Sequence, residues 1–312
     1  MLESSLDPIL HQSTLQTLAP ETTETPLFST LVGLCQEPAH QPTPYKQQRQ
    51  QEQNWPLICA LLDGIFHNDP TQLEHAIAQV THHTTTWDAL HKKAPQRWLN
   101  KVMEGEQLPM MSVVMHIDLR QHNLSLKQLQ YLLQHKHLDH VKILRIDEAR
   151  LSSLAGILLA QSPMLQQLQE LYLGYNPELD EMGSAQLFQH GDFSNMQVLS
   201  LAGTRFGDES MKQLVGNTTI RQLKHLYLNE NTITDRGVNM LSLASNLSTL
   251  ETLYLYKNEG ISEKSAVMLQ QRRELGFPSL EVADLSECNV PHTLCQKLAA
   301  PPQQNTSKPN FA

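Results

Sequence analysis

The sequence predicts an α/β solenoid, a horseshoe with a parallel sheet on its concave side, helices on its convex side and a helical block capping its N-terminal end. Two observations favour this fold class. A short apolar pattern recurs seven times at nearly constant spacing, and helix-like segments follow the copies. One such unit cannot bury both its strand and its helix, so neighbouring units must stack into a continuous core.

The repeats occupy the C-terminal two thirds of the 312-residue chain, within residues 111–300. The copies begin at Val114, Val141, Leu168, Met196, Leu223, Leu250 and Leu280. Successive starts are therefore 27, 27, 28, 27, 27 and 30 residues apart. Regular self-similarity of this kind is the signature of a repeat architecture.

The spacing within one copy predicts the strand and the curvature. In LKHLYLNENTI, apolar residues stand at positions one, four, six and eleven, counted from Leu223. Positions four and six, Leu226 and Leu228, point to the same side of a short strand. Paired strands lie about 4.8 Å apart, whereas packed helices need about 8–10 Å. The stack must curve with its strands inside, and seven strands predict a sheet about 30 Å long.

The segments that follow the strands carry helical spacing. TDRGVNMLSLASNL opens on Thr234 and Asp235, which are N-cap candidates, and spaces Val238, Leu241 and Leu247 at roughly helical intervals. GDESMKQLV and SEKSAVMLQQ repeat the arrangement in neighbouring copies. These segments predict the convex helices.

The pattern L-x-x-L-x-L-x-x-[N/C]-x-L resembles that of leucine-rich repeats, and the unit length is similar to their ribonuclease-inhibitor-like class. In that family, position nine bonds backbone groups of neighbouring turns. The residues that fit it are Asn176, Asn231, Asn258 and Cys288. His122, Ala149 and Thr204 depart from it, which implies a weaker ladder in the first, second and fourth repeats.

The N-terminal third divides into two predicted parts. Residues 1–54 are expected to be largely disordered or loosely ordered, because Gln36 to Asn54 combines Pro, Gln and charge with almost no large apolar residue. Residues 55–110 are predicted to form a helical cap, with Asp69 and Pro70 as a helix start. At the other end, residues 301–312 are expected to be a disordered tail.

The helical block permits a second interpretation. WPLICALLDGIF followed by DPTQLEHAIAQVTHHTTTW loosely resembles an F-box. The apolar positions that carry the resemblance are Trp55 with Pro56, Leu61, Ile65, Leu73, Val80 and Trp87. The resemblance implies an adaptor that recruits substrates to a ubiquitin ligase and binds the subunit onto which F-boxes dock. A plain cap accounts for the same residues.

Exposed positions of the repeat hold most of the chain's tyrosines. Positions five and seven should face the concave solvent side, with position eight beside them. Five of the seven tyrosines fall here: Tyr172, Tyr175, Tyr227, Tyr254 and Tyr256. Tyrosine anchors protein interfaces because it buries a large area with little loss of rotamer entropy. It also suits strands and pairs across them, so sheet stabilisation is the alternative.

The predicted partner-binding residues extend beyond the tyrosines. Asn229 and Lys257 occupy the same exposed positions, and Arg120 and Arg145 lie on the first two strands. Charges on those strands can orient a partner protein.

No catalytic residue, metal site or cofactor is predicted. The phosphate-loop, zinc-protease, serine-hydrolase and dinucleotide motifs are absent from the sequence. His135, His137 and His140 do not share one helical face and no ligand set completes them, so solvated surface histidines are expected. Cys288 stands at a ladder position, which favours a buried structural thiol.

Charge and composition narrow the function. A net charge of −9 argues against nucleic-acid binding. No apolar run approaches the ~18–20 residues that span a bilayer, and the scattered cysteines favour a cytosolic compartment. The sequence therefore predicts a non-catalytic scaffold for protein–protein interaction.

The Gln- and His-rich, Arg-poor composition, together with the repeats, resembles leucine-rich-repeat effectors that intracellular bacteria deliver into host cells. The resemblance implies a host protein as partner and the host cytosol as working compartment. A housekeeping cytosolic scaffold is the alternative.

Overall fold

The computed structural model describes residues 26–36, 43–68 and 70–300. Contacts within the chain define two compact units, with the boundary between Thr85 and Thr86. The disorder expected for residues 1–25 and for the tail at 301–312 lies outside the described residues.

The first unit is helical. It contains α1 (Pro26–Cys35), α2 (Pro44–Asn68), the 3₁₀ turn η2 (Pro70–Gln72) and α3 (Leu73–His83). Helix α1 contacts both α2 and α3. Residues 44–54, which were expected to be loosely ordered, form the first half of α2. Gln, Lys, Arg and Glu are good helix formers, and Gln51 and Trp55 are buried.

The second unit is built on one parallel sheet whose seven strands follow one another in chain order. The strands are β1 (His116–Asp118), β2 (Ile143–Arg145), β3 (Glu170–Tyr172), β4 (Val198–Ser200), β5 (His225–Tyr227), β6 (Thr252–Tyr254) and β7 (Val282–Asp284). Paired residues run from His116 with Ile143 to Thr252 with Val282, at the offsets that the sequence repeat has. The predicted sheet is confirmed.

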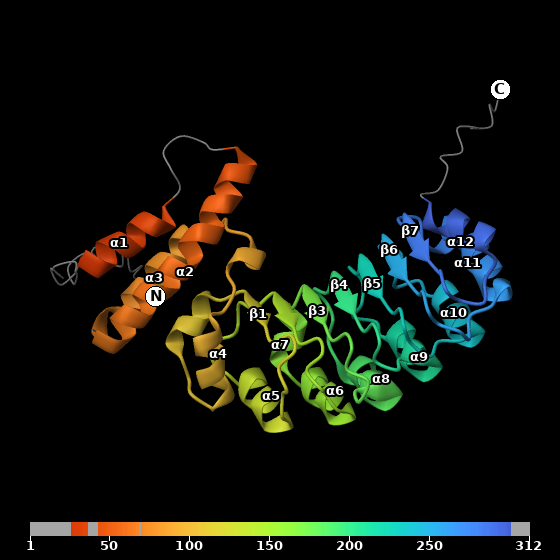
Figure 1. Cartoon of the computed structure of the whole chain (residues 1–312), viewed down its shortest axis with the longest axis horizontal. Helices are drawn as coiled ribbons and strands as arrows, with labels where there is room; N and C mark the ends of the chain where they lie inside the picture. The colour runs from red at the N-terminus through yellow and green to blue at the C-terminus, as the bar shows by residue number, and fades with distance from the viewer. Residues whose placement is uncertain (1–25, 37–42, 69, 301–312) are drawn as a thin grey trace, which may run out of the picture. The chain divides into compact units, whose positions relative to one another are not determined.

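Helices cover the outer side of the sheet, as Figure 1 shows for the second unit. They are α4 (Gln96–Met103), α5 (Leu126–Leu133), α6 (Ser153–Ala160), α7 (Pro163–Gln167), α8 (Asp180–His190), α9 (Asp208–Gly216), α10 (Asp235–Ser242), α11 (Glu263–Gly276) and α12 (His292–Ala299). The predicted N-cap is confirmed at α10, where the Thr234 hydroxyl accepts a hydrogen bond from the Arg236 N–H.

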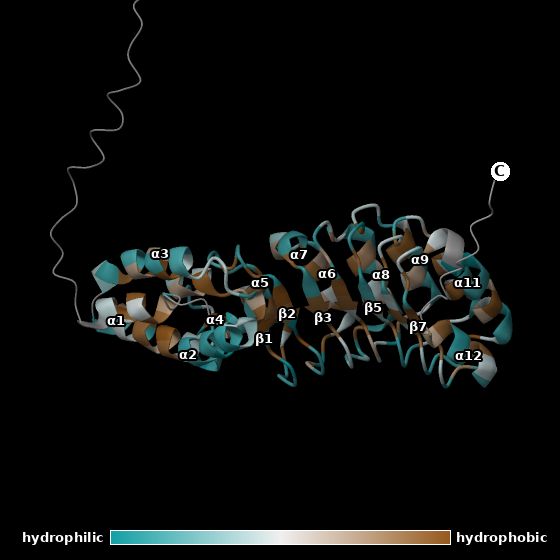
Figure 2. Cartoon of the chain, turned by 90° about the horizontal axis from the view of Figure 1, so that it is seen from above, coloured by the Kyte–Doolittle hydropathy of each residue, from teal (hydrophilic) through white to brown (hydrophobic). Residues whose placement is uncertain are grey.

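The core lies between the sheet and the helices. Leu226 and Leu228 are fully buried, and the equivalent leucines of other repeats stack beside them. Figure 2 shows hydrophobic residues along the strands and more hydrophilic ones on the loops. Helices α6 and α8 approach so closely that a Cβ on Gly156 would lie 2.1 Å from the Gly183 carbonyl oxygen. Glycine is required at this contact.

Asparagines at position nine tie adjacent repeats together. The Asn231 Oδ1 accepts from the N–H groups of Thr204 and Phe206 at 2.9 Å, and its Nδ2 donates to the Leu201 carbonyl at 2.7 Å. Where the fourth repeat has threonine, the Thr204 hydroxyl donates to Leu201 of its own turn, and Ala149 of the second repeat has no polar side-chain atom. The weaker ladder expected at these repeats is confirmed.

Both ends of the sheet are closed by residues of the second unit. At the N-terminal end, Lys93 forms an isolated parallel bridge with His116, next to the turns η3 (Ala89–His91) and η4 (Pro109–Val113). The cap was predicted to span residues 55–110, but the boundary between the two units falls inside this range, after Thr85. Residues 55–85 belong to the first unit, and residues 86–110 belong to the second. At the C-terminal end, buried Arg273 donates hydrogen bonds to the carbonyls of Leu280 and Leu298.

Candidate functional site

The concave face consists of repeat positions three, five and seven. Each strand covers positions three to five, so positions three and five point to the same side. The sequence prediction used positions five and seven and missed position three, although the two-residue period of a strand already places it on this face. Position three contributes two residues that matter below, His116 on β1 and Glu170 on β3.

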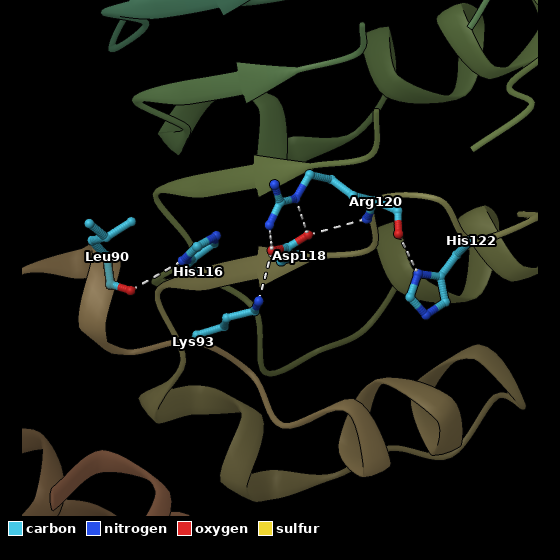
Figure 3. Close-up of polar contacts among 6 residues, drawn as sticks. All are labelled: Leu90, Lys93, His116, Asp118, Arg120 and His122. Carbon is cyan, nitrogen blue, oxygen red and sulfur yellow. Dashed lines mark hydrogen bonds and ion pairs between the residues drawn. The ribbon is translucent and has the colours of Figure 1, made fainter. Parts of the chain in front are cut away.

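The charged half of this face, on β1–β3, begins with a carboxylate held by two cations (Figure 3). Asp118 accepts from the Lys93 Nζ at 2.7 Å and from the Arg120 Nε and Nη2 at 2.9 and 2.8 Å. Position five is predicted to face solvent, but Asp118, which holds this position in the first repeat, is buried because these two side chains cover it. Burial alone raises the pKa of Asp118; the bonds from Arg120 and Lys93 outweigh it and hold the pKa well below its usual range.

His116 lies beside this cluster on β1. Its Nδ1 is 3.2 Å from the Leu90 carbonyl oxygen, a contact visible in Figure 3. Burial lowers the pKa of His116. A neutral ring in contact with a carbonyl carries its proton on Nδ1, so His116 helps to join β1 to the residues before it.

The second part of the charged half is a stacked pair on β2 and β3. The Arg145 guanidinium carbon lies 4.2 Å from the centre of the Tyr172 ring. The Tyr172 hydroxyl donates to the Glu170 carboxylate at 2.9 Å. Burial and the nearby Glu170 charge raise the pKa of Tyr172 far above its usual value. Tyr172 therefore has a cation on its face and a carboxylate on its hydroxyl, all within the chain.

The aromatic cluster, Tyr227, Tyr254 and Tyr256, lies on β5 and at the end of β6. The rings of Tyr227 and Tyr254 stack with centroids 5.2 Å apart and planes 7° from parallel. The ring of Tyr256 stands at 86° to that of Tyr254, with centroids 6.3 Å apart. All three side chains are half-buried. Asp284 pairs with Tyr254 across the β6–β7 register and so borders the cluster.

A rim of residues at position eight runs along one edge of the concave face. The rim consists of Gln121, Glu148, Tyr175, Gly203, Glu230, Lys257 and Glu287, and each has a φ between 53° and 64°. The Tyr175 ring passes beside Gly203, where a Cβ would lie 2.8 Å from its Cδ1. Its hydroxyl donates to Glu230 at 2.9 Å, and Lys257 lies 3.6 Å from the same carboxylate. Burial and the Glu230 bond raise the pKa of Tyr175 to about 12.

Comparisons with known proteins agree with this geometry. Residues 219–242, which include strand β5 and helix α10, match a family model described as leucine rich repeat. The fold is a leucine-rich-repeat solenoid.

Two solved structures resemble parts of this leucine-rich-repeat solenoid. One is the crystal structure of the Rad7 and Elc1 complex in yeast, with 19% identity over 58% of this chain and 43% of that chain and a TM-score of 0.47. The other is the TLR13–ssRNA13 complex, with 19% identity over 60% of this chain and 28% of that chain and a TM-score of 0.39. The chain thus spans less than half the length of either. No curated protein matches the sequence.

The solenoid brings the predicted partner-binding residues together in three groups. Tyr227, Tyr254 and Tyr256 form the aromatic cluster, as their register predicted. Tyr175 and Lys257 meet at Glu230 on the rim. Arg145 with Tyr172, and Arg120, lie in the charged half. Asn229 is the exception to the predicted exposure, because it is buried.

Sequence reasoning missed the residues that complete these groups. Lys93 lies before the first repeat, where no periodic signal marks it. Glu170 stands at the overlooked position three. Asp284 stands at position five of the last repeat, and the 30-residue offset of that repeat already makes it a neighbour of Tyr254.

The prediction of solvated histidines is wrong for His135. This side chain is buried, and its Nε2 accepts a hydrogen bond from the Leu108 N–H at 3.0 Å. Burial, with a smaller effect of His137, lowers the pKa of His135 to about 4. The ring is therefore a neutral acceptor that attaches the η4 segment to the end of α5.

The Cys288 thiol is not suited to act as a nucleophile, and the described residues hold no metal-ligand cluster. The half-buried Cys288 donates its thiol hydrogen to the Leu255 carbonyl oxygen at 3.3 Å, and burial raises its pKa to about 11. A thiol with that pKa is a weak nucleophile at neutral pH. Within residues 26–36, 43–68 and 70–300, no cluster of three His, Cys, Asp or Glu side chains could hold a metal ion, and no helix could span a membrane.

Proposed function

We propose that this solenoid is a non-catalytic scaffold that binds a partner protein through its concave face. The observation that carries the proposal is the aromatic cluster, because three half-buried tyrosines gather on two neighbouring strands and keep part of each ring at the surface. Tyrosines in such positions gain stability by covering their remaining apolar area.

The charged half supports the same proposal in a different way. Arg120 and Lys93 are each about half exposed although they hold Asp118. Exposed charges beside an apolar contact orient an approaching protein and raise its association rate. The seven-stranded sheet is long enough for an interface of standard size.

A photo-cross-linking experiment tests this face. Tyr254 is replaced by p-benzoylphenylalanine in the full-length protein, and Leu243, which is 65% exposed at the end of α10, serves as the matched convex control. Irradiation in cells should yield a discrete cross-linked protein at position 254 and not at 243. Equal products at both positions would contradict the proposal. Changing Tyr172, Tyr227 and Tyr256 together to Ala should abolish the product without unfolding the chain.

The effector role and the host cytosol as working compartment are part of the same proposal. They are supported by the Gln- and His-rich composition. A translocation reporter fused to the full chain, in an intracellular bacterium with and without its secretion system, tests them. Reporter activity in host cells should require the secretion system.

The adaptor alternative concerns the residues that resemble an F-box. Trp55, Ile65, Leu73 and Val80 are buried in the first unit, whereas Trp87 lies beyond its boundary. Helix packing alone accounts for this burial. The full-length protein should bind the purified adaptor subunit if the alternative holds, and the absence of a complex at high protein concentration would end it.

A further inference from the structure

The two halves of the concave face contain the same kinds of acceptor for a cation. Strand β1 carries Asp118 at position five, and strand β7 carries Asp284 at position five. Strand β3 carries Tyr172 at position five, and strand β6 carries Tyr254 there. Because repeat positions are equivalent in space, these acceptors point to the same side of the sheet.

The halves differ in whether the chain supplies the cation. Just after β1, position seven is Arg120, whose guanidinium donates two hydrogen bonds to Asp118. Just after β7, position seven is Ser286, whose backbone N–H donates to the Asp284 carboxylate at 2.8 Å. The carboxylate that has an arginine partner at one end of the sheet thus has a serine neighbour at the other.

The tyrosine faces differ in the same way. Arg145 covers Tyr172 at 4.2 Å. Among the side chains that the structure describes, no cation lies over Tyr227, Tyr254 or Tyr256.

Negative charge surrounds these uncovered rings. Asp284, Glu287 and Glu230 all act on the hydroxyl of Tyr256. The one opposing charge among them, Lys257, is already paired with Glu230 at 3.6 Å. Asp284 and Glu287 have no cationic partner among the described residues. An aromatic face next to uncompensated carboxylates attracts a guanidinium through both its ring quadrupole and its charge.

We propose that the aromatic cluster receives an arginine side chain of the partner protein, which stacks on the Tyr254–Tyr256 corner and pairs with Asp284. This inference rests on the proposed function, since it names the chemistry that the partner brings to that face. The arginine would cover the Tyr254 ring as Arg145 covers the Tyr172 ring. It would also pair with Asp284 as Arg120 pairs with Asp118.

Tyrosine-ring NMR of the full-length protein provides the test. The chain has seven tyrosines, so a ring-labelled sample gives few signals, which single Tyr→Phe variants assign. The probe is the peptide acetyl-Gly-Gly-Arg-Gly-Gly-amide, compared with its citrulline and glutamate counterparts. Citrulline has nearly the same shape as arginine without the charge. We expect saturable shifts of the Tyr254 and Tyr256 signals with the arginine peptide alone and an unmoved Tyr172 signal.

Two matched variants locate the charge that matters. Asp284→Asn keeps an oxygen for the Ser286 N–H and should weaken peptide binding about threefold or more. Glu209→Gln, which removes a carboxylate from convex helix α9, should leave it unchanged. Circular dichroism checks that both variants fold. Equal shifts with the citrulline peptide, no shift at Tyr254 and Tyr256, or equal binding by Asp284→Asn would each overturn the inference.

The cross-linked partner separates this inference from the proposed function. If position 254 captures a protein whose capture neither the arginine peptide nor Asp284→Asn reduces, the arginine inference fails and the scaffold stands. If position 254 captures nothing, the proposed function fails, whatever the peptide does.

Discussion

The charged half on β1–β3 and the aromatic half on β5–β7, which holds the aromatic cluster and Asp284, use equivalent repeat positions on different strands. They differ in how their carboxylates and tyrosine rings are partnered. Asp118 and Tyr172 have cations from within the chain at 2.7–2.9 Å and 4.2 Å. Tyr254 and Asp284 have each other and a serine backbone. In a solenoid, a single residue at position seven or on the preceding strand decides whether the chain itself supplies the cation for a carboxylate or a tyrosine ring on the concave face.

The difference also separates stability from recognition. The charged half is joined to the N-terminal end of the second unit through Lys93 and through the contact between His116 and Leu90. Changes there should alter folding. Changes in the aromatic half should alter binding and leave folding nearly intact.

Acid should produce the largest effect, and it should act at the N-terminal end. The pKa of His135 is about 4 in the folded protein, below the ordinary histidine value of about 6.5 that applies in the unfolded chain, so the unfolded chain binds its proton first. The contribution of His135 is complete above pH 6.5 and is lost as the pH falls toward 4, reaching about 3 kcal/mol near pH 4. Urea unfolding across this pH range measures it.

The variant His135→Gln keeps an acceptor for the Leu108 N–H but does not titrate. It should therefore lose less stability than the parent between pH 7 and pH 4. Parallel losses in both proteins would show that another group controls the acid response.

Asp118→Asn should cost about 2 kcal/mol of the free energy of unfolding at pH 7. The full penalty for breaking a buried ion pair is not expected, because Lys93 and Arg120 are half exposed and can turn into water. Urea unfolding of the variant and the parent measures the difference. A cost below that of Asp284→Asn would remove the contrast between the two halves.

Arg145→Gln should cost about 1 kcal/mol, the scale of one cation–π contact. It should also convert part of the charged half into a copy of the aromatic half, because it uncovers the Tyr172 ring. We expect the Tyr172 signal to shift with the arginine peptide in this variant, as it does not in the parent. A Tyr172 signal that stays unmoved would indicate that ring exposure alone does not attract the cation.

The smallest stability effect is expected for Asp284→Asn, within about 0.5 kcal/mol. The amide can still accept from the Ser286 N–H, and Asp284 has no cationic partner among the described residues to lose. Thermal unfolding of the variant checks this. A melting temperature several degrees below that of the parent would place Asp284 among the structural residues.

The sequence predicted the features that follow from the residue pattern within a single repeat. The strand register follows from the spacing of apolar residues, and the outward placing of Tyr227 and Tyr254 follows from alternation along a strand. Contacts between a repeat and residues outside the repeat pattern were missed. Asp118 is buried by Lys93, which precedes the first repeat, and His135 is buried because η4 folds over the end of α5.

The first unit shows the complementary limit. Composition predicted a loosely ordered segment before Trp55. Composition indicates whether a segment can form a hydrophobic core by itself. It does not indicate whether a polar segment continues a helix that starts in the core. Gln, Lys, Arg and Glu continue α2 toward Pro44 on helix propensity, with Gln51 packed into the unit.

The left-handed rim has a consequence for redesign. Six of its seven residues carry side chains in a backbone conformation that costs roughly 1–2 kcal/mol for any L-residue. Exchanging one such side chain for another leaves that cost nearly constant, while a glycine would relieve it. The chemistry of this edge can therefore be changed one residue at a time, and the stability of the solenoid should change little.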